Sequence, residues 1–273
     1  MSSLVGNVQE TLNELRVTLV QSELFWHEPV KNRAMFADKL APLAGKTDLV
    51  ILPEMFTTGF SMEPESIAEV ADQKTLQWMQ QQSSSISAVL CGSVAVKDDA
   101  GCYNRFYWVE PDGQWQSYDK HHLFRMAGEH KHYQAGQSRD VIHYKGWRIF
   151  PQICYDLRFP VWSRNRNRYD LAIYVANWPE VREHPWQVLL QARAIENLCY
   201  VAGVNRVGID GNGYKYSGRS ALIDFKGHSS GDHDGGEAFV ETYPIDLNEL
   251  RGFREAFPAF EDADDFILKQ DKG

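Results

Sequence analysis

With 273 residues, the chain is long enough to bury a substantial core, and its 43% hydrophobic and 24% charged residues are typical of globular proteins. The net charge is −9 and the basic residues are scattered apart from a short run at 164–168, so nucleic-acid binding is not expected. We also expect no membrane partner, because no apolar run approaches about 18 residues and no secretion signal is recognisable. The cysteines at 91, 102, 154 and 199 do not form a disulfide framework, which favours a cytoplasmic location.

Short runs rich in β-branched and aromatic residues alternate with segments whose apolar residues recur three and four positions apart. The short runs predict strands at 16–24, 47–56, 87–96, 170–178 and 198–208. The longer segments predict amphipathic helices at 28–44, 74–86 and 184–197. Turn-forming residues predict two hairpins, one over 104–120 and one over 220–245. The pattern indicates one α/β domain spanning residues 1–273.

Polar residues interrupt several of the predicted strand ends. Glu54 follows a buried apolar run, Cys154 ends another, and Asn177 ends a third. Lys120 closes the first hairpin, and Glu129 follows nine residues later. Ligands of α/β sheets bind where strands end, although each residue alone also fits a cap, a surface ion pair or a solvated turn.

The sequence allows two interpretations of Cys154, as a structural or as a nucleophilic cysteine. A structural cysteine is a small buried hydrophobe, whereas a nucleophilic cysteine needs partial exposure and a basic or cationic partner. Its position, between the apolar end of "WRIFPQIC" and the polar "YDLR", suits a side chain that projects from a rigid element into a cleft.

Three motifs, "LPEMF", "YDKHHLF" and "CYDLRFP", occur in this order along the chain. Together they resemble the carbon–nitrogen hydrolase, or nitrilase, superfamily and its Glu-Lys-Cys triad. The segments 177–208 and "FREAFPAFEDADDF" are similar to those of the bacterial ω-amidase branch. The resemblance implies a four-layer α-β-β-α sandwich of two packed mixed sheets with helices outside, a homodimer, and no metal or cofactor.

The resemblance also assigns roles that amide hydrolysis requires, namely a nucleophile, a proton carrier and a positive charge for the oxyanion. Cys154 is the expected nucleophile, and Glu54 is expected to accept its proton and pass it to the leaving ammonia. Lys120 and the backbone N–H of Tyr155 are expected to stabilise the oxyanion. Glu129 is a second carboxylate that orients Lys120 and keeps it charged.

The ω-amidase branch acts on the terminal amide of 2-oxo dicarboxylic acid monoamides such as 2-oxoglutaramate, so a cation is expected near the substrate's carboxylate. Arg158 and Arg125 lie close to the triad motifs and are the candidates, although Arg158 could instead pair with Asp156. The other candidate substrate contacts, some of which could equally fill the core, are Phe60, Phe124, Asn177 and Trp178.

Other functions remain open at this point. Nitrilases and N-carbamoyl hydrolases use the same triad, and a papain-like Cys-His pair would also use a cysteine. A zinc site could draw on His121, His122, His130 and His132, although their spacing is unusual for zinc. A catalytically silent binding or scaffold protein is a further class, which the intact triad argues against. Residues 1–15 precede the first expected strand and are interpreted as an N-terminal extension.

Overall fold

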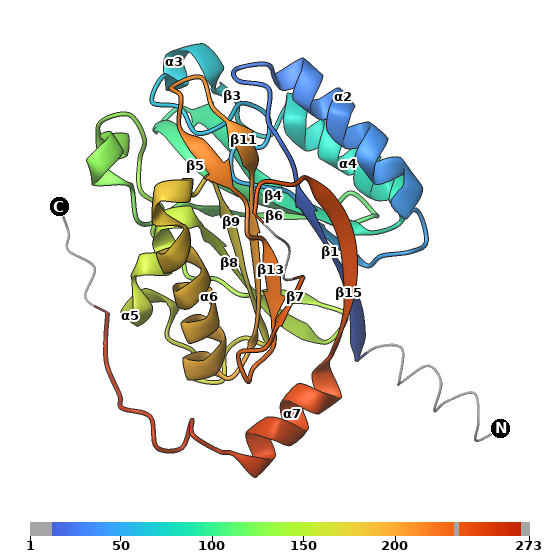
Figure 1. The fold of residues 1–273 in the computed structure, drawn as a ribbon, viewed down its shortest axis with the longest axis vertical. Coiled ribbons are helices and arrows are strands. Elements are labelled where there is room, and N and C mark those ends of the chain that lie inside the picture. The colour runs from blue at the N-terminus through green and yellow to red at the C-terminus, as the bar shows by residue number, and fades with distance from the viewer. Residues whose placement is uncertain (1–12, 232–234, 269–273) are drawn as a thin grey trace.

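The computed structural model describes residues 13–231 and 235–268. Figure 1 shows its strands, which are β1 (Glu14–Gln21), β2 (Leu49–Ile51), β3 (Glu69–Val70), β4 (Val89–Asp98), β5 (Gly101–Val109), β6 (Trp115–Asp119), β7 (Ile142–Tyr144), β8 (Trp147–Ile153), β9 (Leu171–Ala176), β10 (Tyr200–Asn205), β11 (Val207–Ile209), β12 (Lys215–Ser217), β13 (Ala221–Ile223), β14 (Ser229–Ser230) and β15 (Phe239–Asp246). The α-helices are α2 (Pro29–Leu40), α3 (Pro64–Ile67), α4 (Lys74–Ile86), α5 (Pro160–Ser163), α6 (Glu183–Asn197) and α7 (Leu247–Ala256). Short 3-10 helices are η1 (Ala41–Leu43), η2 (Arg125–Ala127), η3 (Glu129–Lys131), η4 (Cys154–Arg158) and η5 (Glu180–Arg182).

The strands form two large mixed sheets. The first has the order β15-β1-β2-β4-β5-β6, with β3 paired to β4, and the second has the order β14-β13-β10-β9-β8-β7. Parallel pairs lie at the centre of each sheet, between β1, β2 and β4 in one and between β8, β9 and β10 in the other. Antiparallel strands complete both edges, and β11 and β12 form a separate ribbon.

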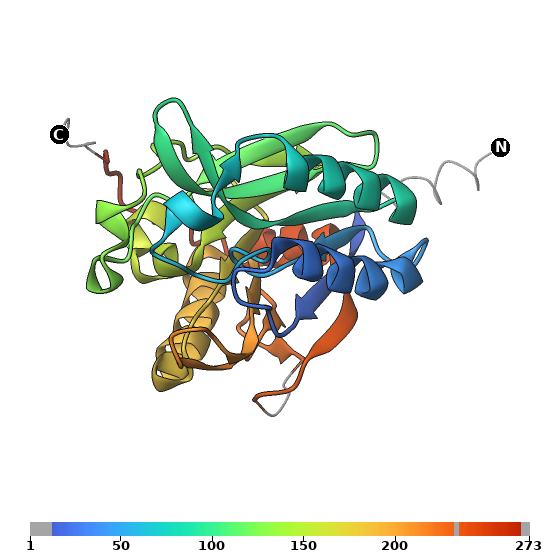
Figure 2. The same cartoon turned by 90° about the horizontal axis from the view of Figure 1, so that it is seen from above.

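The two sheets pack face to face, because one continuous apolar cluster contains side chains from both. Val17 and Ile51 of the first sheet share this cluster with Ile149 and Val175 of the second. Helices α2 and α4 cover the outer face of the first sheet through a second apolar cluster, while α6 packs its buried side chains on the second sheet. Figures 1 and 2 show these helices on opposite sides of the sheets. The predicted four-layer sandwich is confirmed.

The predicted hairpin over 104–120 is confirmed by the antiparallel pairing of β5 with β6. The hairpin predicted over 220–245 is wrong. Its first strand, β13, pairs with β10 and β14 in the second sheet, whereas β15 pairs with β1 in the first sheet. Both strands were located correctly, but the connection between them passes from one sheet to the other.

Of the predicted N-terminal extension 1–15, residues 1–12 lie outside the described part of the chain. Strand β1 begins at Glu14, so the last two residues of that range belong to the sheet. Among the helices of residues 13–231 and 235–268, none is long and apolar enough to cross a membrane.

The contact between α6 and β10 yields a stability prediction. Leu190 of α6 is 1% exposed and covers Gly203 of β10, where an added Cβ would collide with a Leu190 methyl group. Leu190→Ala is expected to lower the free energy of unfolding by about 2–5 kcal/mol, because it leaves a cavity beneath the helix. Val188 lies on the same helix but is 46% exposed, so Val188→Ala is the matched control.

Urea titration of the two variants measures this difference. The control is expected to change the free energy of unfolding by roughly 0.5 kcal/mol or less. Equal losses in both variants would mean that Leu190 does not carry the packing of α6 on the second sheet.

Candidate active site

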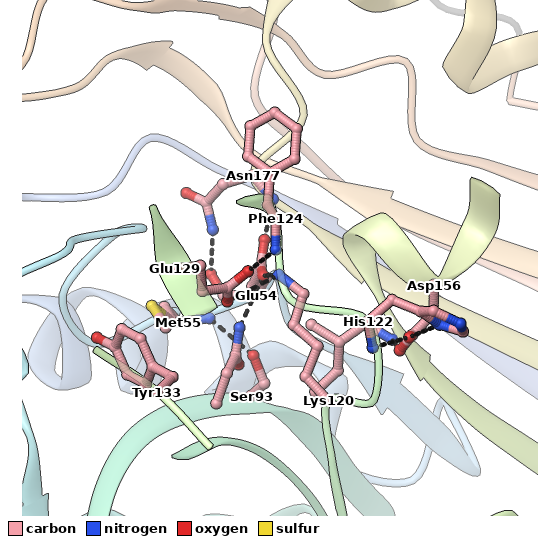
Figure 3. A network of polar contacts seen from close by, with 12 residues as sticks. Glu54, Met55, Ser93, Lys120, His122, Phe124, Glu129, Tyr133, Asp156 and Asn177 are labelled. Carbon is pink, nitrogen blue, oxygen red and sulfur yellow. Dashed lines mark hydrogen bonds and ion pairs between the residues drawn. The ribbon is translucent and has the colours of Figure 1, made fainter. Parts of the chain in front are cut away.

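Glu54 lies three residues beyond β2 and is fully buried, yet both of its carboxylate oxygens have partners. Asn104 Nδ2 and Lys120 Nζ donate to Oε1 over 2.8 and 2.9 Å. The backbone N–H of Asn177 donates to Oε2 over 2.8 Å, and Asn177 Nδ2 donates to the Glu54 carbonyl over 2.6 Å. Residues on or next to strands of both sheets therefore fix the position of this carboxylate. Figure 3 shows Lys120 and Asn177 around it.

Lys120 follows β6 and is also fully buried. Its Nζ donates to Glu54 Oε1 over 2.9 Å and to Glu129 Oε1 over 3.0 Å, which places the ammonium between two carboxylates (Figure 3). The other oxygen of Glu129 accepts the backbone N–H of Phe124 over 2.5 Å. The ring of Phe60 lies 5.0 Å from the ammonium and covers a further side of it.

The charges of this cluster depend on one another. Burial opposes the charge of Lys120, but Glu129 and Glu54 outweigh it and raise the pKa of the ammonium. Burial raises the pKa of Glu129, and repulsion from Glu54 acts in the same direction, while Lys120 opposes both effects. The ammonium is therefore charged throughout the neutral range, and it compensates only one of the two carboxylates.

Cys154 begins η4 directly after β8 and has a left-handed backbone, with φ of 46°. Met55, the residue after Glu54, also has a positive φ of 42°. Such residues persist only where neighbours hold them, at a cost of about 1–3 kcal/mol each. Ser93 Oγ accepts a hydrogen bond from the backbone N–H of Met55 over 2.9 Å. Asp156 Oδ2 accepts one from the backbone N–H of Ile153, the residue before Cys154, over 3.0 Å.

The carboxylate of Asp156 joins the turn that carries Cys154 to the loop that follows Lys120. Asp156 is fully buried and accepts hydrogen bonds from Tyr118 Oη over 2.8 Å and from the backbone N–H of His122 over 2.9 Å. His122 Nδ1 lies 2.8 Å from Asp156 Oδ1 (Figure 3). This carboxylate therefore sets the distance between the thiol-bearing turn and the lysine loop.

The contacts of His121 and His122 can be compared with those that a zinc site would need. His122 Nδ1 contacts Asp156, and His121 Nδ1 contacts the carbonyl of Gly136 at 2.6 Å while its ring stacks on Trp162. Within the described ranges, no three His, Cys, Asp or Glu side chains are grouped so that they could hold a metal ion. The histidine positions thus favour packing and loop support.

The surroundings of Cys154 determine the state of its thiol. The residue is partly exposed, in contrast to Cys91 and Cys199, which are buried. Burial of its sulfur raises the pKa of Cys154 well above that of an ordinary thiol, the carboxylates of Glu54 and Glu129 add to this, and Lys120 opposes it. A cysteine in this setting rests as a neutral thiol and needs a base to accept its proton during attack.

Tyr155 is the second residue of η4, so its backbone N–H lies in the first turn, where helical N–H groups have no intrahelical acceptor. An N–H beside the thiol is suited to an oxyanion. The ring of Tyr155 packs on Phe124 at 5.0 Å between centroids.

The other predicted substrate contacts divide into two groups. Arg158 is exposed, and its guanidinium lies 5.0 Å from the ring centroid of Trp178, which is itself 4% exposed. Within residues 13–231 and 235–268, no ion pair joins Arg158 to Asp156, so the structural alternative for this arginine is not supported. Arg125 lines a cavity of about 380 Å³ together with Tyr155, Phe159 and the histidines His121, His122 and His130.

Sequence patterns did not identify two residues that hold the cluster together. Asn104 lies within β5 and is fully buried. The available signal in the sequence was an amide side chain within a strand rich in aromatic residues. Asp156 was considered only as a partner of Arg158. The structure instead assigns Asn104 to Glu54 and Asp156 to the Cys154 turn.

The raised pKa of Cys154 predicts how its thiolate forms with pH. An ordinary cysteine ionises near pH 8.5, so the thiolate absorbance of Cys154 is expected to rise with a midpoint above that pH. The measurement is the difference in ultraviolet absorbance near 240 nm between the wild-type protein and Cys154→Ser across a pH titration. A midpoint below 8.5 would contradict the dominance of burial and the two carboxylates over Lys120.

Comparison with known proteins places this geometry in context. The chain is 48% identical to the omega-amidase YafV of Escherichia coli, an alignment that covers 93% of this chain and 98% of the relative. It is 31% identical to the 2-oxoglutaramate amidase of Bacillus subtilis, over 90% of this chain and 96% of that one. The crystal structure of XC1258 from Xanthomonas campestris, described as a CN-hydrolase superfamily protein with an arsenic adduct in the active site, superimposes with a TM-score of 0.91 at 48% identity, covering 94% and 99% of the two chains.

The family model described as carbon-nitrogen hydrolase matches residues 8–255, a range that includes each member of the buried cluster and the thiol beside it. Since that match spans most of the chain and the relatives align along nearly their whole length, this protein belongs to the carbon–nitrogen hydrolase family.

Proposed function

We propose that this protein is a thiol-dependent amidase that hydrolyses the terminal amide of a 2-oxo dicarboxylic acid monoamide and releases ammonia. One observation carries the proposal: the Lys120 ammonium lies 2.9 and 3.0 Å from two buried carboxylates, beside a cysteine on a left-handed turn. The names of the relatives, omega-amidase and 2-oxoglutaramate amidase, support an amide substrate over a nitrile or an N-carbamoyl group.

In the acylation half-reaction, Cys154 Sγ attacks the amide carbon while Glu54 accepts the thiol proton. The negative charge that develops on the amide oxygen is stabilised by the Lys120 ammonium and the Tyr155 N–H. The C–N bond then breaks as Glu54 gives its proton to the departing nitrogen, so ammonia leaves and a thioester remains on Cys154. The neutral resting thiol makes the proton acceptor indispensable.

In the second half-reaction, Glu54 accepts a proton from water as the water oxygen attacks the thioester carbon. The same two donors stabilise the second tetrahedral oxyanion. Collapse breaks the C–S bond, the proton on Glu54 returns to sulfur, and the free acid leaves. Glu129 takes no proton in this sequence and instead fixes the direction of the Lys120 ammonium.

The substrate's carboxylate is assigned to Arg158, whose guanidinium stacks on Trp178. Asn177 supports Glu54, and Phe60, Phe124 and Trp178 border the site as apolar walls. Arg125 is the second candidate for the carboxylate. We also infer that the chain forms one domain, acts in the cytoplasm and assembles as a homodimer.

Cys154→Ala is expected to abolish ammonia release from 2-oxoglutaramate while the protein remains folded, because the nucleophile is lost but no core volume is removed. Cys102→Ala provides the matched control, since Cys102 is also partly exposed. Ammonia assays with 2-oxoglutaramate, glutamine, an aliphatic nitrile and an N-carbamoyl amino acid, together with circular dichroism, make the comparison.

A folded Cys154→Ala protein that keeps its activity would refute the nucleophile. Wild-type protein that prefers the nitrile or the N-carbamoyl substrate would refute the ω-amidase proposal and leave the family assignment intact.

Arg158→Met tests the carboxylate assignment, because methionine keeps the contact with Trp178 and removes the charge. The expected loss in kcat/KM for 2-oxoglutaramate is about 10- to 100-fold, since a charge-assisted hydrogen bond contributes roughly 1.5–3 kcal/mol. Hydrolysis of pentanamide, a neutral amide of equal chain length, is expected to change little. Equal losses on both amides would make Arg158 structural, and Arg125→Met would then show the selective loss.

A further inference from the structure

The buried cluster presents a difficulty for an anionic substrate. Two buried carboxyl groups, those of Glu54 and Glu129, share the single ammonium of Lys120 beside the Cys154 thiol. The whole chain is also acidic, with a net charge of −9. A carboxylate brought next to this cluster is repelled unless cations face it at close range.

Two arginines supply such cations at the border of the cluster. The guanidinium of Arg158 lies 5.0 Å from the ring centroid of Trp178, and that of Arg182 lies 5.4 Å from the ring centroid of Phe124. Across residues 13–231 and 235–268, neither guanidinium lies within ion-pair distance of a carboxylate, whereas Arg105, Arg148 and Arg254 all do. An arginine stacked on a ring keeps its N–H edge available for a carboxylate.

Phe124 itself contacts Glu129, and Trp178 is the chain neighbour of a residue that contacts Glu54. The backbone N–H of Phe124 donates to Glu129 over 2.5 Å, and Trp178 directly follows Asn177, whose N–H donates to Glu54 over 2.8 Å. Figure 3 shows Phe124 and Asn177 on the same side of Glu54 and Glu129. The positions of the two guanidinium groups are therefore tied to the two buried carboxyl groups.

A hydrogen bond also links the main chain of Arg182 to the ring that lies beneath Arg158. Trp178 Nε1 donates to the backbone carbonyl of Arg182 over 2.6 Å. Arg182 ends η5, which connects the Asn177 loop to α6, and it is partly buried. Its main chain is thus held by the ring beneath Arg158, while its side chain reaches across to Phe124.

We propose that Arg182 is a specificity-determining residue that binds the substrate's free carboxylate together with Arg158. This inference rests on the proposed function. Arg125 is the alternative cation for this role, because it lines a cavity of about 380 Å³ together with Tyr155 and three histidines. The substrate class that fits is a short monoamide whose far end is an anionic 2-oxo acid.

The test uses the full-length protein and compares Arg182→Met, Arg182→Lys and the control Arg251→Met, an exposed arginine of α7. Each is assayed for kcat/KM on 2-oxoglutaramate and on pentanamide. A second measurement is the Kd of 2-oxoglutaramate for Cys154→Ala with and without Arg182→Met, by titration calorimetry. For 2-oxoglutaramate, Arg182→Met is expected to lower kcat/KM about tenfold and to raise the Kd about tenfold. The kcat/KM for pentanamide is expected to stay unchanged.

Arg182→Lys is expected to recover part of that loss, because it restores the charge without the planar pair of donors. Equal losses on both amides, or an unchanged Kd, would overturn the role of Arg182. A failure of the proposed function would be distinguishable from this result, because the wild-type protein itself would show no preference for 2-oxoglutaramate over pentanamide.

Discussion

The ammonium of Lys120 lies 2.9 Å from Glu54 and 3.0 Å from Glu129, and all three side chains are fully buried. Two carboxylates at this depth would repel each other and take up protons without the cation between them. Burial of the Cys154 sulfur raises the pKa of this thiol, and the two carboxyl groups add to that effect. The same ion cluster therefore fixes a carboxyl group close to a thiol that requires a proton acceptor under the proposed mechanism.

The position of this cluster follows from the way the sheets meet. The first sheet supplies Glu54 after β2, Asn104 within β5 and Lys120 after β6, whereas the second supplies Cys154 after β8 and Asn177 after β9. Hydrogen bonds between Asn177 and Glu54 cross from one sheet to the other. The packing of the two sheets therefore also sets the position of Cys154 relative to Glu54.

Sequence patterns could predict many of the strands and helices, because burial periodicity is a local signal, whereas the Glu-Lys-Cys triad was predicted from the resemblance of three motifs to a known family. They could not predict that β13 and β15 belong to different sheets, since periodicity identifies a strand but not its partner. The sequence did not identify the contacts of Asn104 and Arg182 for a related reason. A polar residue within a strand and an arginine after a turn have many uses, and only the three-dimensional contacts with Glu54 and Phe124 distinguish among them.

The dependence of the cluster on its cation is tested most directly by the free energy of unfolding of Lys120→Met, measured from pH 8 to pH 5 against the wild-type protein. Removing one partner of a buried ion pair costs about 3–5 kcal/mol, so a loss of this size is expected near neutral pH. Without the ammonium, the folded variant binds protons on its buried carboxylates more readily than the unfolded chain, so the loss should shrink as the pH falls. The pair of the exposed Lys145 with the partly buried Asp48 provides the control, and Lys145→Met should change stability by about 1 kcal/mol or less. A Lys120→Met protein as stable as the wild type, or a loss that does not vary with pH, would contradict the account.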